Sequence, residues 1–369
     1  MAGLSPTIGK IFGIDIELHW TFVLLLVFAF LLSYPSLYGF LIIVLLFACV
    51  LLHELAHSVT SKVNGIMVKK IILLPIGGAS VINLDDIAPS QSFYIALAGP
   101  LASVLLGLVF GLAAVFSTGG TVTQTLQLLF LLNILLGVGN LLPAFPLDGG
   151  RVLKSYLQEK RSALVSTKIA VKASNAVLVL LVLGTIAYAA WLPGATFFYR
   201  EFVVLWTLII VMFLYGGAQS ELQSAYVLEY ASGLHARDAI SKNFMIVTPQ
   251  TSMRQLYKKL LEEKSHIAIF KDGKKFRVVT RLVANPLSKS SADMMNKTVL
   301  SFSMLIPQIS FDASLSEAIK RIRFEEAPVI AVTKNGKIVG VLLEQHVEQL
   351  LALHMPQIMA ADKQGKRHN

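Results

Sequence analysis

The stretch Leu41-Ile42-Ile43-Val44-Leu45-Leu46-Phe47-Ala48-Cys49-Val50-Leu51-Leu52 runs directly into His53-Glu54-Leu55-Ala56-His57. On a helix, His53 and His57 lie one turn apart on the same face, so both imidazoles can reach one Zn²⁺. The carboxylate of Glu54 then lies beside the metal, where it can act as a base toward water. Because the apolar run is long enough to form part of a membrane span, the sequence predicts that this metal site lies within the bilayer.

The composition of the whole chain indicates a membrane protein. Its 369 residues are 55% hydrophobic and only 15% charged, and the mean hydropathy is +0.67. In a soluble protein, about a quarter of the residues are charged. We therefore predict six membrane helices of about 20 residues each. They are expected at roughly Leu18–Tyr34, Tyr38–Val59, Phe93–Phe116, Thr123–Leu142, Ile169–Leu192 and Phe197–Tyr215.

The charges of the connecting loops predict the orientation of these spans. After the first, third and fifth spans, the connections hold no basic residue apart from Arg200. Basic loops are retained on the cytoplasmic side, so we expect a multi-pass protein of the cell membrane with both termini in the cytoplasm. The basic residues of the second and fourth connections are Lys62, Lys69, Lys70, Arg151, Lys154, Lys160, Arg161 and Lys168.

The net charge of +10 belongs mainly to the C-terminal part of the chain. Through Gly233 there are eleven Lys and Arg against ten Asp and Glu, and from Leu234 on there are twenty-one against twelve. No basic stretch interleaved with aromatic residues accompanies this excess, so we expect no nucleic-acid partner. A solvated basic surface near anionic lipid headgroups explains the excess better.

The loop Met67–Ser80 is rich in β-branched residues and carries a Gly-Gly break. This composition predicts a short hairpin or edge strand close to the metal site. Such an edge could pair with an extended substrate. A re-entrant loop with only a structural role is the alternative.

A catalytic zinc site usually has three protein ligands and keeps a fourth position for water. Asp148 is the candidate third ligand, because a carboxylate at the end of an apolar span is costly unless it is paired or metal-bound. The segment Pro143-Ala144-Phe145-Pro146 before it and Gly149-Gly150 after it would unwind the helix and let the side chain turn inward. The alternatives are a helix N-cap or an ion pair with Arg151.

Three other residues near the predicted site have more ordinary interpretations. Asn140 could contact substrate, or it could bond to a neighbouring helix. Cys49 shares a helix face with His53, but it lies about 12 Å from His57 along the helix axis, so we interpret it as a small buried residue. His19 next to Trp20 is typical of a membrane interface.

Together these motifs resemble the site-2 protease family of intramembrane zinc metalloproteases. The resemblance rests on the His-Glu-x-x-His motif, the Asn140–Arg151 stretch, Ala96-Leu97-Ala98-Gly99-Pro100 and the opening Gly13–Trp20, and it extends from about Ser5 to Gly217. It implies hydrolysis of a peptide bond within or next to a transmembrane segment of a membrane protein. It also implies one Zn²⁺ per chain, held by His53, His57 and Asp148, with Glu54 as the catalytic residue.

From about Leu234 the hydropathy falls and two similar units follow one another. Each unit has an extended segment, a helix, a strand, a turn with Lys and Gly, and a second strand, which indicates a tandem repeat. We predict an α-helical polytopic membrane domain followed by a cytoplasmic α/β pair. The expected segments are a metalloprotease domain at 1–230, repeats at 235–288 and 292–354, and a polar tail at 355–369.

The two repeats resemble a pair of CBS domains, best at Asp312–Ala318 and Ala327-Pro328-Val329. In that family, a Ser or Thr followed three residues later by Asp binds the ribose of adenine nucleotides. Here Thr280 is followed by Val283, and Leu343 by His346, so the acidic residue is lacking and an adenine nucleotide is not the expected ligand. The resemblance implies a regulatory or dimerising role, and a homodimer through these domains is expected.

Two other readings of the chain make different predictions. A membrane transporter or channel regulated by CBS domains would also keep ionisable residues and broken helices at the depth of its functional site. It would bind no zinc and would not need Glu54 as a carboxylate. A metal-free scaffold is disfavoured because the His-Glu-x-x-His motif and Asp148 are intact.

Overall fold

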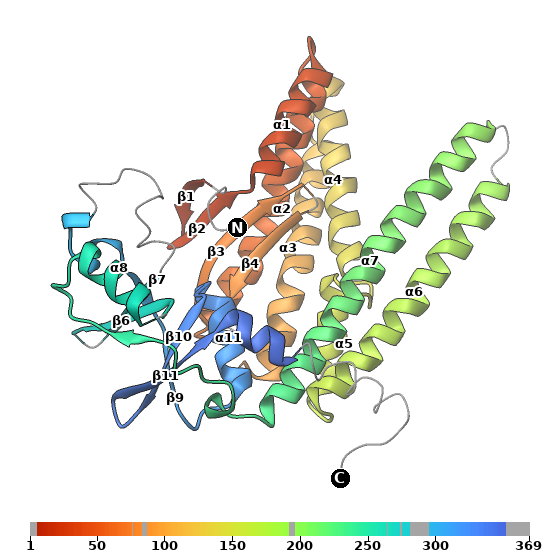
Figure 1. The fold of residues 1–369 in the computed structure, drawn as a ribbon. Helices are drawn as coiled ribbons and strands as arrows, with labels where there is room; N and C mark the ends of the chain where they lie inside the picture. The colour runs from red at the N-terminus through yellow and green to blue at the C-terminus, as the bar shows by residue number, and fades with distance from the viewer. Residues whose placement is uncertain are drawn as a thin grey trace. The chain divides into compact units, whose positions relative to one another are not determined.

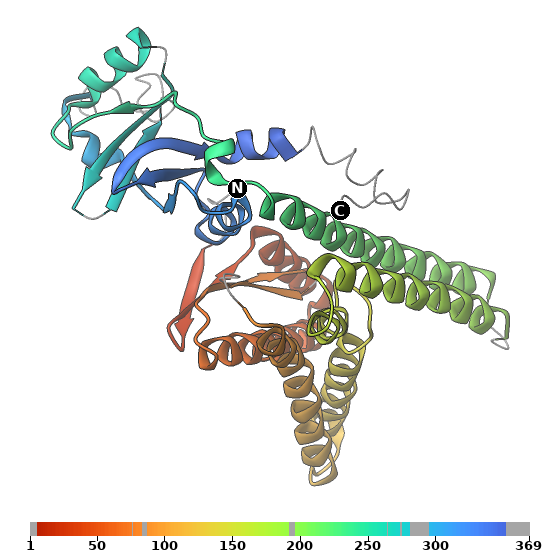
Figure 2. The same ribbon diagram turned by 90° about the horizontal axis from the view of Figure 1, so that it is seen from below.

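The chain divides into two units, Met1–Ala225 and Tyr226–Asn369 (Figures 1 and 2). The first unit consists of long apolar helices and one sheet, and the second is an α/β structure. The computed structural model describes residues 6–75, 77–82, 87–191, 196–263, 265–273, 275–280 and 295–351.

Five helices of the described residues are long and apolar enough to cross a membrane. Five of the six predicted spans are therefore confirmed. The first is shorter than predicted: its 14 residues extend about 21 Å, less than the ~30 Å of a bilayer core. The helices are α1 (Trp20–Ser33), α2 (Tyr38–Val63), α3 (Pro89–Val115), α4 (Gly120–Asn140), α6 (Ala163–Trp191) and α7 (Phe197–Ser232).

A four-stranded sheet in the order β1-β2-β3-β4 completes this unit (Figure 1). The hairpin predicted in the Met67–Ser80 loop is present as β3 and β4, which pair antiparallel, with β4 at the edge of the sheet. The strand pair before α1 was not predicted. The first strand is exposed throughout and carries no hydrophobic alternation, whereas the second, Ile14–Leu18, alternates and was missed. The strands are β1 (Thr7–Ile11), β2 (Ile14–Leu18), β3 (Val68–Leu74) and β4 (Gly77–Ile82).

The sheet packs against α2, the helix that carries the His-Glu-x-x-His motif. Ile14 and Ile71 are fully buried and form one cluster with Leu55 of α2. Leu55 lies between the two histidines of the motif in the sequence. Glu54 directly precedes Leu55 in the sequence. Packing of the sheet against Leu55 therefore holds the edge strand β4 beside Glu54.

The segment between α4 and the next helix differs from its prediction. We expected Asp148 to end the fourth span, but α4 ends at Asn140 and Asp148 is instead the first residue of a separate helix, α5 (Asp148–Gln158). Pro143 and Pro146 explain the break, because proline removes a backbone donor and clashes with the preceding turn. Phe145, in the middle of this turn, is completely buried against α6 and α7.

The second unit confirms the predicted repeat of two α/β halves. Within each half a strand pairs in parallel with the strand after its helix, and that strand continues into an antiparallel hairpin. Both helices begin at a serine N-cap, Ser252 and Ser314, whose side chain accepts a backbone N–H three residues later. The elements of the two halves are β5 (Met245–Ile246), α8 (Met253–Glu262), β6 (Ile267–Asp272) and β7 (Lys275–Thr280), then β9 (Gln308–Ser310), α11 (Leu315–Glu325), β10 (Val329–Lys334) and β11 (Lys337–Leu343).

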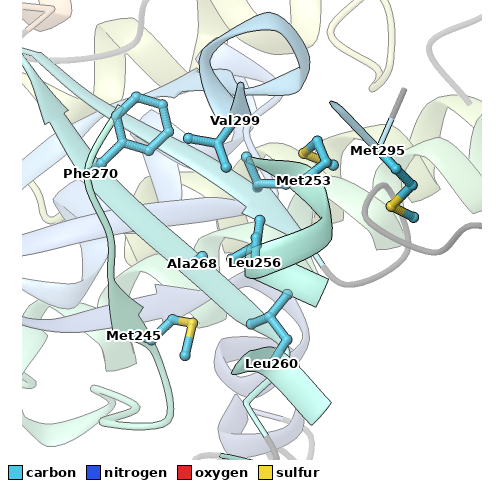
Figure 3. Close-up of a cluster of buried hydrophobic side chains, with 9 residues drawn as sticks. Met245, Met253, Leu256, Leu260, Ala268, Phe270, Met295 and Val299 are labelled. Atoms are coloured by element: carbon cyan, nitrogen blue, oxygen red, sulfur yellow. The ribbon is translucent and has the colours of Figure 1, made fainter. Parts of the chain in front are cut away.

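The sheet of the first repeat contains one strand that lies outside that repeat. A strand preceding the second half, β8 (Met304–Ile306), pairs with β7 and extends the first sheet to β5-β6-β7-β8. Apolar side chains cover this sheet, and Figure 3 shows Met253, Leu256 and Leu260 of α8 in one cluster with Ala268 and Phe270 of β6. Val283, His354 and the tail at 355–369 lie outside the described residues. The short helices are η1 (Ala236–Asp238) and η2 (Val299–Phe302).

Candidate metal centre

Three side chains from two distant parts of the first unit converge at one point. The Nε2 atoms of His53 and His57 lie 3.2 Å apart. The Oδ2 atom of Asp148 is 3.1 Å from the first and 3.2 Å from the second. Both imidazoles are buried, at 4% and 7% exposure. The helical spacing of the motif and the turn before α5 thus bring together a group of ligand atoms that could hold one metal ion.

The outer nitrogen of each imidazole is held by a partner on α3. His57 Nδ1 lies 2.6 Å from the carbonyl oxygen of Ile95. Because a carbonyl only accepts hydrogen bonds, Nδ1 donates to it, which leaves Nε2 as the ring atom that faces the ligand group and could bind a metal ion. His53 Nδ1 lies 2.9 Å from the hydroxyl of Ser103. These contacts orient both rings as metal ligands are oriented.

The backbone of α3 closes one side of this group. A Cβ atom added to Gly99 would lie 2.2 Å from Nε2 of His57 and 2.7 Å from Nε2 of His53. Only glycine therefore lets the backbone of α3 lie this close to the two imidazoles. Two imidazole nitrogens and one carboxylate oxygen around one point fit a catalytic zinc site, which takes three protein ligands and keeps one position for water.

Asp148 is held in place by the turn that precedes it. A Cβ atom on the following residue, Gly149, would lie 2.3 Å from the carbonyl oxygens of Leu141 and Leu142, so the turn can fold back only with glycine there. Neither alternative role of Asp148 is seen. Leu147 occupies the N-cap of α5, with no capping bond from its side chain.

The basic residues of α5 interact with Glu221 of α7, and Arg151 also lines the cavity of the ligand group. The Arg151 guanidinium lies 3.8 Å from Glu221 Oε1, which removes the expected alternative of an ion pair between Arg151 and Asp148. One turn further on, burial lowers the pKa of Lys154, and the charge of Glu221 opposes that effect. The positive charges of Arg151 and Lys154 are thus partly balanced by Glu221 within the first unit.

Glu54 lies beside the ligand group in the same cavity, which has a volume of about 730 Å³. The carboxylate accepts a hydrogen bond of 2.9 Å from Ser80 of β4. Asn140, predicted as a substrate contact, also lines this cavity. The cavity therefore contains a candidate ligand set, the carboxylate of Glu54 and residues of the edge strand β4. Its lining includes His53, His57, Gly78, Pro146, Asp148 and Phe213.

Comparison with known proteins identifies the family to which this site belongs. Residues 41–125 and 117–184 match peptidase family M50. A zinc metalloprotease of Methanocaldococcus jannaschii is 30% identical over 352 residues, which cover 93% of this chain and 95% of that protein. The chain belongs to peptidase family M50, the site-2 protease family. The resemblance predicted from the motifs is confirmed.

Solved structures resemble each of the two units. A site-2 protease of Methanocaldococcus jannaschii is 35% identical and covers 59% of this chain and 95% of that one, with a TM-score of 0.44. A CBS domain-containing protein of Kribbella flavida is 19% identical and covers 32% of this chain and 99% of that one, with a TM-score of 0.28. Its family, the five long apolar helices of its described residues and the fold of its second unit make this M50 protein a multi-pass membrane metalloprotease with a C-terminal α/β pair.

The remaining histidines and Cys49 are not part of the M50 ligand group. Among the described residues, no other cluster of His, Cys, Asp and Glu could hold a metal ion. Cys49 is buried, as predicted. His19 has a structural role, since its ring nitrogen accepts the backbone N–H of Thr21 at the start of α1.

Several residues around the M50 site were not predicted from the sequence. Ser103, the Ile95 carbonyl and Ser80 all contact predicted site residues, yet none lies near them in the sequence. Gly99 belongs to a segment that carried the family resemblance, but its contact with the imidazoles gave no sequence signal. A buried serine or glycine is too common in apolar helices to mark a site by itself.

Proposed function

We propose that this protein is an intramembrane zinc endopeptidase in which His53, His57 and Asp148 hold the metal and Glu54 is the catalytic base. The convergence of the three ligand atoms within about 3.2 Å of one another, two of them on a helix able to cross a membrane, is the observation that carries the proposal. Membership in family M50 supports the same reaction, hydrolysis of a peptide bond of a membrane protein.

Each residue of the site has a separate role in the proposed reaction. When bound, zinc polarises the scissile carbonyl and makes water more acidic. Glu54 takes a proton from the attacking water, whose oxygen bonds to the carbonyl carbon. As the C–N bond breaks, the same carboxylate delivers the proton to the leaving nitrogen. Ser103 and the Ile95 carbonyl keep both imidazoles in the orientation that ligation needs.

The substrate is a transmembrane protein of which a segment enters the cavity in extended form. A peptide bond within a helix is shielded by the helix's own backbone hydrogen bonds, so the substrate has to unwind before it is cut. The edge of β4 offers backbone groups to such a strand. Asn140 at the end of α4 is another polar residue that lines the same cavity.

The C-terminal pair has a regulatory or dimerising role in this proposal, and both termini lie in the cytoplasm. The basic connections after α2 and after α4 support this orientation. A homodimer through the pair is the expected assembly, with the lipid bilayer around the first unit. An adenine nucleotide is not the expected ligand, because His346 stands where the second repeat would need an acidic residue.

The competing function, a transporter or channel with the same C-terminal pair, has no specific support. Family M50 consists of peptidases, and the ligand group and base lie together as a hydrolase requires. A transporter would not need Glu54 to be a carboxylate. The substitution Glu54→Ala therefore separates the two functions.

A cleavage assay tests the proposal. The wild type and Glu54→Ala are reconstituted in lipid vesicles with a panel of single-span membrane proteins, and new termini are located by mass spectrometry. We expect cuts within or next to a span from the wild type and none from Glu54→Ala. The exposed Glu159→Ala is the matched control and should cut like the wild type. Equal cleavage by Glu54→Ala would contradict the proposed mechanism.

A further inference from the structure

Glu54 needs a support of its own, because its side chain is long and flexible. A glutamate has three rotatable side-chain bonds, and a base that is misplaced by about 1 Å loses much of its effect. His53 and His57 are each fixed by a partner on α3. The described residues give Glu54 a partner from another element, the edge strand β4.

Ser80 is this partner. Its hydroxyl donates to Oε2 of Glu54 over 2.9 Å. A hydrogen bond to an ionised carboxylate is stronger than one between neutral groups. One carboxylate oxygen is thus fixed, while the other stays available toward the cavity that contains the ligand group.

A second hydroxyl completes the arrangement. Ser58 lies one helical turn after Glu54 on α2 and is completely buried. Its Oγ is 3.3 Å from the Oγ of Ser80. Because Ser80 uses its only proton on Glu54, Ser58 has to donate its own proton to Ser80. The result is a directed chain from Ser58 through Ser80 to Glu54.

The backbone of β4 restricts Glu54 from another direction. A Cβ atom on Gly78 would lie 2.4 Å from Cγ and 2.9 Å from Cδ of Glu54. The strand therefore lies directly against the side-chain stem, while Ser80, two residues along on the same face of β4, holds its end. Contact at both the stem and the carboxylate leaves the side chain little freedom.

We propose that Ser80 is a positioning residue that holds the carboxylate of Glu54 for proton transfer, with Ser58 fixing the direction of the Ser80 hydroxyl. This inference rests on the proposed role of Glu54 as the base. It also gives β4 two functions, since the strand that offers its edge to an extended substrate is the strand that places the base. A substrate strand paired with β4 would then lie in a fixed register relative to Glu54.

Kinetics with three variants test the proposal, using labelled casein as an unfolded probe and the purified full chain in detergent. We expect Ser80→Ala to lower kcat about tenfold, with KM within about twofold and the zinc content unchanged. Ser80→Thr keeps the hydroxyl and should recover most of kcat. Ser117→Ala, which removes a serine hydroxyl near the far end of α3, should match the wild type.

A spectroscopic measurement gives a readout that needs no turnover. The ¹³C NMR resonance of the Glu54 carboxyl carbon, assigned by its loss in Glu54→Gln, should shift in Ser80→Ala and return in Ser80→Thr. An unchanged resonance together with an unchanged kcat would overturn the proposal. A rise in kcat would also overturn it, because the bond would then hold the base away from its working position.

The outcomes separate this inference from the proposed function. If Glu54→Ala abolishes cleavage while Ser80→Ala cuts like the wild type, only the role of Ser80 fails. If Glu54→Ala still cuts casein, the proposed base fails and the role of Ser80 fails with it. Loss of zinc from Ser80→Ala would show that the residue supports the structure of the site, which contradicts a positioning role.

Discussion

The two units of this protein bury very different residues. Around the metal centre several of the buried side chains are polar, such as His53, His57 and Ser103. The core of the C-terminal unit is apolar, with Leu256 and Phe270 buried almost completely. The contrast reflects the two solvents, because apolar side chains gain little by leaving lipid, whereas they gain much by leaving water.

Close approach takes the place of hydrophobic burial in the membrane unit. A Cβ atom on Gly137 of α4 would lie 2.8 Å from the carbonyl oxygen of Pro100 on α3. Glycine at this crossing lets the two backbones come together, as small residues commonly do between membrane helices. We therefore expect substitutions in the first unit to act mainly on the site, and substitutions in the second to act mainly on stability.

The largest effect is expected from Glu54→Ala. Loss of the base should lower cleavage about 10³-fold, while the melting temperature stays close to that of the wild type because the side chain is only partly buried. Cleavage assays and thermal melts on the same preparation measure both quantities. Zinc content should be retained, since the ligand group is intact. A stable variant that still cuts at the wild-type rate would refute the assignment of the base.

Leu256→Ala should have the opposite profile. Its side chain is fully buried in the apolar core of the second unit, so truncation should cost about 2–5 kcal/mol of that unit's unfolding free energy. Calorimetry of the full chain measures the loss, and metal analysis should find the zinc content unchanged. Leu261→Ala, at 42% exposure, is the control and should cost less than about 0.5 kcal/mol. Loss of zinc from Leu256→Ala would break the separation of the two units.

Gly99→Ala should act on the metal rather than on the fold. The new methyl group would collide with both imidazoles, and relief of such overpacking costs about 1–3 kcal/mol. We expect zinc affinity to fall accordingly, by about tenfold to a hundredfold, in a competition with a chromogenic chelator. Gly184→Ala on α6 is the matched control, because nothing lies within 4 Å of its Cβ position. Equal zinc affinity in the two variants would show that Gly99 does not border the metal.

The smallest effect is expected from Cys49→Ala. The thiol is buried one turn before His53 but does not belong to the ligand group. The substitution should change stability by about 1 kcal/mol or less and should leave zinc content unchanged. Metal analysis and thermal melts provide the check. A variant that lost its zinc would give Cys49 a role in the site that its position does not explain.

Much of the candidate metal centre could be predicted from the sequence, because its residues lie in short motifs that can be recognised without the tertiary fold. The spacing of His53 and His57 sets two ligands on one helix face, and an isolated acidic residue in an apolar region identifies Asp148. The prediction that Asp148 lies at the end of the fourth span was wrong, because Pro143 and Pro146 end α4 completely instead of only distorting it.

The contacts that organise the site could not be predicted, because they join segments distant in the sequence. Ser80 reaches Glu54 across 26 positions, and Ser103 reaches His53 across 50. Each is an ordinary serine in an apolar neighbourhood, and the tertiary fold alone selects it. The pattern of the repeats, by contrast, predicted the extended segment, helix and two strands of each half, because hydrophobic alternation is a local signal. It did not predict β8, which joins the sheet of the first half.

The measurement that tests the central claim most directly is the zinc content of the protein purified in detergent under metal-replete conditions. The wild type is compared with His57→Ala and Asp148→Ala, with Gly184→Ala as a control for handling. The account predicts about one zinc per chain in the wild type and the control, and weakened or lost zinc in the two ligand variants. A wild type without zinc, or ligand variants that bind it as tightly as the wild type does, would contradict the account.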